Sequence, residues 1–134
     1  MSREVFPYAD DRAFIDAWLL GKPRATVSDW LNLAGGNLNL MGNTIAWIGT
    51  DGALYAKLPN SQWLYPAIRA LDHIARNLGM ESAEITVEEC VVEDTSKHGS
   101  RLFHAGTQIN HEQPFVLCGP LGMQAYRATT GVTP

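Results

Sequence analysis

Cysteine and histidine are the residues of this chain whose types and spacing come nearest to a catalytic or metal-binding set. His104 and His111 precede Cys118, and a fold that gathers the three would make a metal site or a thiol beside a base. Asn110 is available to orient such a base. The histidines lack the i, i+4 spacing of a helical zinc site, and no catalytic signature surrounds Cys118. We therefore expect no catalytic residue, no metal and no cofactor, and keep a small Cys/His enzyme as an alternative.

Six acidic residues between positions 81 and 94 form the strongest local charge pattern. On a strand, Glu84 and Glu88 would share one face, while Glu89 and Glu93 would share the other. Paired carboxylates perform acid–base chemistry only in a cleft that shifts their pKa values, and the sequence indicates no such cleft. We interpret the segment as a charged edge strand that resists aggregation.

A DNA-binding hypothesis rests on the segment 11–34. Ala17, Gly21 and Val27 have the relative spacing of the small, turn and core residues of a helix-turn-helix, whose second helix enters the major groove. The residues that would contact DNA are Lys22, Arg24, Thr26 and Ser28. This spacing alone is weakly specific. We keep a DNA-binding regulator as a second alternative, beside an ordinary helical hairpin that packs on a sheet.

Aromatic residues gather where the longest helix is expected to begin. Trp63 and Tyr65 occur there beside two prolines, and side chains of this kind serve both as interface anchors and as core. We predict that the contacts with a protein partner come from Tyr55, Lys57, Trp63 and Tyr65.

The bulk composition is typical of a single globular domain. The chain has 134 residues, of which 46% are apolar, so it has enough material for a core of its own. Its formal net charge of -4 is opposite in sign to that of a generic nucleic-acid-binding protein. No apolar segment has the character of a signal peptide or the ~20 residues of a membrane span. We expect a cytoplasmic protein with no membrane partner, and leave homo-oligomers open.

The first half of the chain predicts two helices, a three-strand meander and a third helix. The first helix is expected from Asp10 or Asp11 to Leu20, and the second from Thr26 to Ala34, where Gly35-Gly36 end it. Turns at Gly42-Asn43 and Asp51-Gly52 separate strands expected at 38–41, 44–48 and 53–58. The helical period of apolar residues over 61–78 predicts the main helix, with Pro66 in its first turn if the helix begins near Tyr65.

The last third of the chain predicts a hairpin and two further short strands. Residues 83–92 are rich in β-branched side chains, and 101–104 would return as their partner. Residues 106–114 are expected to be a loop, and 115–118 and 124–128 to be strands. Residues 1–9 and 129–134 are expected to be flexible ends. Together these elements predict one α+β domain over 1–134, in which a mostly antiparallel sheet packs against about three helices.

One block of the meander resembles a known group of proteins. Residues 40–47, followed by Gly52-Ala53-Leu54-Tyr55 and a helix, resemble small uncharacterised proteins of phages and mobile elements, over about residues 37–79. Met41 stands where that group carries an aromatic residue. The resemblance implies a phage-type accessory protein in the host cytoplasm and assigns no catalytic residue.

The leading functional hypothesis is a non-enzymatic accessory protein that binds and occludes another protein. An inhibitor of a host defence or regulatory complex would fit the size and acidity of the chain. The hypothesis predicts aromatic anchors within a polar rim.

Overall fold

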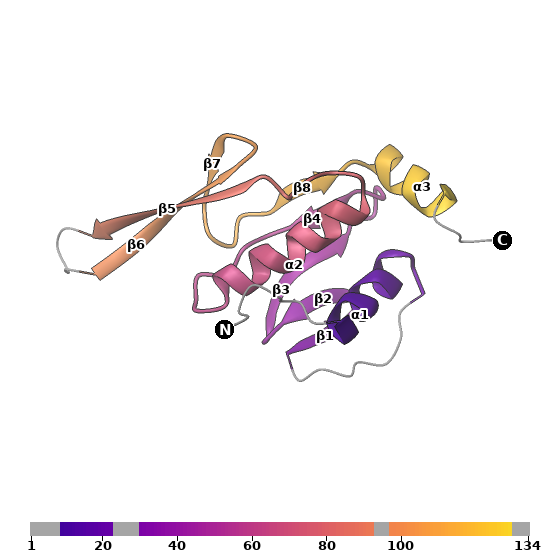
Figure 1. The fold of residues 1–134 in the computed structure, drawn as a ribbon, viewed down its shortest axis with the longest axis horizontal. Helices are drawn as coiled ribbons and strands as arrows, with labels where there is room; N and C mark the ends of the chain where they lie inside the picture. The colour runs from indigo at the N-terminus through magenta and orange to yellow at the C-terminus, as the bar shows by residue number, and fades with distance from the viewer. Residues whose placement is uncertain (1–8, 23–29, 93–96, 130–134) are drawn as a thin grey trace.

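The computed structural model describes residues 9–22, 30–92 and 97–129. Over these ranges the chain forms three helices and two antiparallel sheets, of five and three strands, in one α+β arrangement (Figure 1). The expected flexible ends lie almost wholly outside the described residues, apart from Ala9 and Thr129, which are helical. Within the described ranges, no helix has the length and apolarity needed to cross a membrane.

The larger sheet is a meander that gains a fifth strand from the end of the chain. Its strand order is β1-β2-β3-β4-β8, and every neighbouring pair is antiparallel. The strands are β1 (Leu31–Ala34), β2 (Asn37–Leu40), β3 (Asn43–Ile48), β4 (Leu54–Ala56) and β8 (Phe115–Cys118). The three strands expected between 38 and 58 are therefore confirmed as β2, β3 and β4.

Strand β1 corrects the second predicted helix, which was expected over 26–34. Leu31 and Leu33 lie opposite Leu40 and Leu38 of β2, so their spacing of two places both on the core side. Gly35-Gly36 do not end a helix but form the two-residue turn of the β1–β2 hairpin, with φ of 62° and 84°. Positive φ at both turn residues is the requirement that glycine meets without steric cost.

The next two turns differ in length. Leu40 pairs with Asn43, so the turn residues are Met41 and Gly42 rather than the predicted Gly42-Asn43. The predicted turn at Asp51-Gly52 is confirmed: the Gly49 amide donates to the Ala53 carbonyl oxygen at 2.8 Å, and Gly52 has a φ of 88°. This loop carries the left-handed glycine of a bulged hairpin turn.

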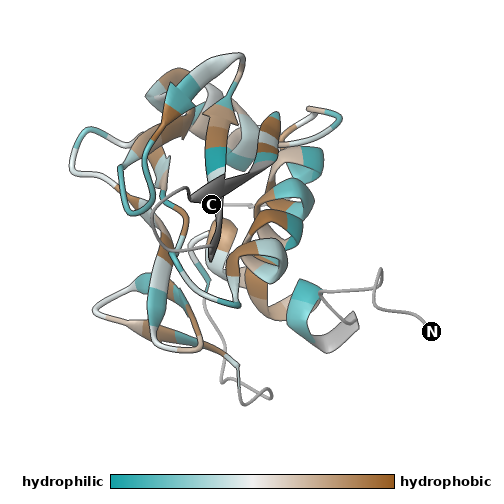
Figure 2. Cartoon of the chain, turned by 90° about the vertical axis from the view of Figure 1, so that its left-hand side faces the viewer, coloured by the Kyte–Doolittle hydropathy of each residue, from teal (hydrophilic) through white to brown (hydrophobic). Residues whose placement is uncertain are grey.

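Helices α1 (Ala9–Leu19) and α2 (Leu64–Asn77) lie together on one side of the larger sheet (Figure 2). Helix α2 confirms the main predicted helix, with Pro66 in its first turn and Gly79 beyond its end at a φ of 90°. The core residues are contributed by both helices and by the strands of the larger sheet, with Leu102, Ile109 and Met123 from later in the chain.

Helix α1 forms polar contacts with the β1–β2 turn and with helix α2. The Trp18 indole donates to the Gly36 carbonyl oxygen at 2.8 Å, which ties α1 to the β1–β2 turn. On the other side, Asp16 Oδ1 lies 2.7 Å from His73 Nε2 and accepts from Asn77 Nδ2 at 2.6 Å. These contacts join α1 to α2.

The second sheet is built around a long hairpin that projects from the body of the molecule (Figure 1). Strands β5 (Ile85–Val92) and β6 (Lys97–His104) confirm the predicted hairpin and pair along their whole length. Strand β7 (Thr107–Ile109) adds to Leu102–His104 across a turn at Ala105-Gly106, in the segment where a loop was expected. The His104 and Phe115 rings, with centroids 4.4 Å apart, connect this sheet to β8.

Residues 124–128, where a strand was predicted, belong instead to helix α3 (Pro120–Thr129). Pro120 takes the first helical position, where its missing amide costs nothing. Met123 is buried, and Tyr126 packs against the same core three residues later, which is helical spacing.

Candidate functional site

The outer face of the larger sheet, opposite α1 and α2, carries an aromatic pair. Along β4, Leu54 and Ala56 are fully buried on the core side, so Tyr55 between them points outward. Trp47 of β3 lies directly opposite Tyr55, and their rings stack with centroids 5.8 Å apart and an interplanar angle of 10°. Neither ring belongs to the core cluster, to which all three helices contribute.

The pair is extended by an aliphatic side chain from the neighbouring strand. Val116 of β8 lies opposite Tyr55 on its other side and is 47% exposed. We call Trp47, Tyr55 and Val116 the outer patch. Lys57 continues the outward alternation of β4, and its Nζ lies 3.4 Å from Glu112 Oε1. An apolar centre is thus flanked by a charged pair.

The Tyr55 ring is fixed by the β3–β4 turn. Its hydroxyl donates to Asp51 Oδ2 at 2.8 Å, and the Ala53 amide donates to Asp51 Oδ1 at 3.0 Å. A Cβ atom at Gly49 would lie 2.5 Å from Tyr55 Cε1, so the ring occupies space that only glycine leaves free. The Ala53 and Tyr55 bonds lower the pKa of Asp51, and the bond to Asp51 raises the pKa of Tyr55.

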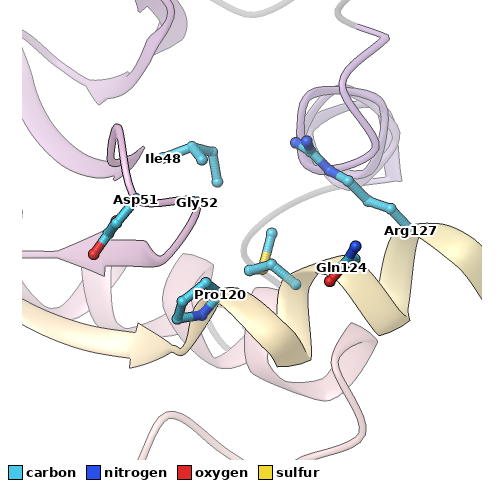
Figure 3. Close-up of a pocket in the computed structure, with 7 residues that line it drawn as sticks. Ile48, Asp51, Gly52, Pro120, Gln124 and Arg127 are labelled. Carbon is cyan, nitrogen blue, oxygen red and sulfur yellow. The ribbon is translucent and has the colours of Figure 1, made fainter.

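A cavity of about 360 Å³ lies beside the same turn, between it and α3 (Figure 3). Its apolar lining comes from Ile48, Gly52, Pro120 and Met123. Its polar lining comes from Asp51, Gln124 and Arg127. The structure therefore offers two candidate sites that share the Asp51 turn.

The four residues predicted to contact a protein partner fall into two places. Tyr55 and Lys57 lie on the outer face of the sheet, as described above. Trp63 directly precedes α2, packs against the core and meets the Trp30 ring edge-on at 6.3 Å between centroids. Tyr65, in the first turn of α2, is 45% exposed. The predicted set is thus divided between the sheet face and the start of the helix.

The histidines of the predicted Cys/His grouping contact other residues in the described structure. His104 stacks on Phe115, and His111 Nε2 lies 3.4 Å from Ser100 Oγ. Among the described residues, no hydrogen bond joins Cys118 to a histidine, and burial raises the pKa of its thiol, which favours the unreactive form. In the part of the chain that the structure describes, no group of three His, Cys, Asp or Glu side chains is placed to hold a metal ion.

The candidate DNA contacts lie mostly outside the described residues. Lys22 is exposed just after α1, whereas Arg24, Thr26 and Ser28 are in the segment that the structure does not describe. The C-terminal part of the predicted recognition helix is strand β1, as shown above. Residues 31–34 are therefore a strand and not the end of a helix.

Trp47 is the candidate residue that the sequence interpretation missed. Both faces of its strand carry large apolar residues, so alternation alone does not tell which one points outward. The signal lies in the turn: with Gly52 as the left-handed loop residue, Ile48 and Leu54 pair, and Trp47 then falls opposite Tyr55.

Comparison of the chain with protein-family models, with curated proteins and with solved structures found no match.

Proposed function

We propose that this protein acts by binding another protein through the outer face of its five-stranded sheet. The observation that carries the proposal is the Trp47–Tyr55 stack, which is partly exposed on the face opposite the helices. Aromatic side chains are enriched at the centres of protein interfaces, because they bury a large area and lose little conformational entropy. The exposed Val116 enlarges this centre.

The surroundings of the outer patch have the polar character of an interface rim. Lys57 and Glu112 form a pair at one side. Toward the other edge of the sheet, Asn39 accepts a hydrogen bond from the Thr44 hydroxyl at 2.7 Å, and Asn32 lies opposite Asn39. An apolar centre with a polar rim fits a protein partner that presents an apolar patch.

The proposed mode of action is occlusion of the partner's surface rather than catalysis. In a phage or mobile-element setting, such a protein would inhibit a host defence or regulatory complex. The small size and acidic charge of the chain agree with this role.

The test is recovery of partners from a lysate of the source cell with tagged protein, followed by measurement of the dissociation constant for the recovered partner. Trp47→Ala and Tyr55→Ala should each weaken binding by about 2 kcal/mol, which is roughly thirtyfold, as expected for interface anchors. Arg101→Ala is the matched control, because Arg101 pairs with Glu88 on the projecting hairpin. Its dissociation constant should equal that of the wild type.

Nuclease treatment of a second sample separates the DNA-binding alternative. A stoichiometric protein that survives nuclease and is lost with Trp47→Ala supports the proposal. Recovery of nucleic acid alone, or a partner that binds the Trp47 and Tyr55 variants as tightly as the wild type, would refute it.

A further inference from the structure

Arg127 lines the cavity between the β3–β4 turn and α3, and contacts with the end of α1 fix the position of its side chain. Its Nε donates to the Leu19 carbonyl oxygen at 3.0 Å, at the C-terminal end of α1. The guanidinium also lies against Gly21: its Cζ and Nη2 atoms are 3.6 Å from the position a Cβ would take there. A cation is favoured at this helix end, where carbonyl groups carry the negative end of the helix dipole. The side chain is therefore held in place before any ligand binds.

No described residue occupies the terminal nitrogens of Arg127. In the described part of the chain, Arg127 forms the bond to Leu19 through Nε and has no ion pair or hydrogen bond through either Nη. Figure 3 shows its side chain extending from α3 toward the side of the cavity on which Ile48 lies. Two adjacent N–H groups of a guanidinium match the two oxygens of a carboxylate.

The rest of the cavity limits the size and charge of the ligand. Ile48, Pro120 and Met123 supply apolar wall, and about 360 Å³ is within the range of small-molecule sites. Asp51 also lines the turn side of the cavity, but its carboxylate accepts from the Tyr55 hydroxyl and the Ala53 amide and points away from the other lining residues in Figure 3. Arg127 is the one cationic side chain among the lining residues, and a phosphate dianion would need more donors than it alone supplies.

We propose that the cavity between the β3–β4 turn and α3 binds a small monocarboxylic acid with an apolar body. The carboxylate lies on the Arg127 Nη groups, and the apolar body lies against Ile48, Pro120 and Met123. This site is separate from the outer patch. A failure of the carboxylate proposal would therefore leave the proposed protein interface untouched, and the reverse also holds.

The test is a titration of the full chain followed by amide NMR shifts, with three probes. 4-Phenylbutyrate carries the proposed charge and apolar body, 4-phenylbutan-1-ol carries the same body without the charge, and inorganic phosphate carries charge alone. We expect 4-phenylbutyrate to shift the Gly52, Met123 and Arg127 amides and to bind at least about tenfold more tightly than the alcohol. Phosphate should cause no saturable shift at these amides.

Two variants and a control locate the binding. Arg127→Gln should abolish the preference for the acid over the alcohol, and its amide spectrum reports whether the loss of the Leu19 bond disturbs the fold. Gln124→Trp leaves Arg127 in place but fills the cavity, so it should remove binding of both organic probes. Arg101→Gln should bind as the wild type does. Equal affinities for acid and alcohol, saturable phosphate binding, or unchanged acid binding in both cavity variants would overturn the proposal.

Discussion

The four tryptophans differ in what surrounds each ring. The Trp18 and Trp30 indoles donate to Gly36 and Asp11, and Trp30 also meets Trp63 edge-on, so these three rings link the helices to the β1–β2 hairpin. Trp47 stacks on Tyr55 outside the core cluster. The same residue type thus helps to build the fold at three positions and lies outside the core at the fourth.

This difference predicts that two alanine substitutions will lower the free energy of unfolding by different amounts. Trp63→Ala should lower the free energy of unfolding by about 2–4 kcal/mol, because a large side chain packed on the core is lost. Trp47→Ala should lower it by less, about 1–2 kcal/mol, because the ring lies outside the core cluster and its loss removes the stack on Tyr55 together with a part-exposed contact area. Urea denaturation followed by circular dichroism measures both. A Trp63→Ala protein as stable as the wild type would show that Trp63 does not contribute to the core and would favour its predicted role as an interface contact.

A substitution at Gly49 tests how closely the Tyr55 ring packs against the β3–β4 turn. Gly49→Ala places a methyl group 2.5 Å from Tyr55 Cε1 and 2.8 Å from Asp51 Oδ1, so the ring or the turn must move. We expect a loss of about 1–3 kcal/mol in the free energy of unfolding, as for overpacked sites. Gly119→Ala is the control: a Cβ there meets no atom within 4 Å, and it should change the same free energy by less than about 0.5 kcal/mol. Equal stabilities of the two variants would contradict the close fit.

At the scale of elements, we expect the junction between the two sheets to be sensitive to pH. Burial lowers the pKa of His104 below its ordinary value of 6.5, and the opposing effect of Glu84 is smaller. The unfolded chain therefore binds a proton more readily than the folded chain does. Stability from this group is complete above pH 6.5 and is lost as the pH falls from 6.5 through the lowered pKa.

His104→Phe should remove this acid-induced loss while it keeps an aromatic contact with Phe115. We expect the free energy of unfolding to fall less between pH 7 and pH 5 in the variant than in the wild type, with urea denaturation at each pH as the measurement. The difference between the two proteins isolates His104, because the carboxylates are common to both. Parallel pH profiles would mean that His104 does not titrate differently in the folded and unfolded chains.

The elements that the sequence predicted correctly are those with a strong local signal. The Asp51-Gly52 turn and the β-branched run at 85–92 identified strands, and the 3.6-residue period identified α2. The predictions for 31–34 and 124–128 failed because each segment is short and its local pattern is ambiguous. Trp30, Leu31 and Ala34 fit a helix, while Leu31 and Leu33 fit a strand, and pairing with β2 decided between them. Residues 124–128 were too short a window to reveal the helix that begins at Pro120.

The candidate sites were harder to predict than the elements, because they depend on contacts between distant segments. Tyr55 was identified, but its partners Trp47 and Val116 come from two other strands, and the latter joins the sheet only through the pairing of β4 with β8. The cavity beside α3 likewise combines Ile48 and Asp51 with Arg127. No periodicity within one element indicates such a combination.

At the scale of the whole molecule, the two sheets differ in how many neighbours support each strand. Strand β3 pairs with β2 and β4, and Ile45 and Ala46 within it are fully buried. Strands β5 and β6 pair with each other, but β7 covers only Leu102–His104, so the distal part of the hairpin is a two-stranded ribbon. A ribbon of two strands is marginally stable by itself, whereas a central strand opens only with the body of the fold.

Amide hydrogen exchange should therefore be faster in the distal hairpin than in the larger sheet. We expect hydrogen-bonded amides in 88–92 and 97–101 to exchange at least about tenfold faster than those of β3, because the ribbon can open without exposing the core. Amides of Leu102–His104, where β7 adds a third strand, should be intermediate. Exchange followed by NMR at neutral pH measures all three groups in one sample. Equal protection of the ribbon and β3 would mean that the hairpin unfolds only with the rest of the molecule, and that its distal part has a packing partner beyond the pairing of the two strands.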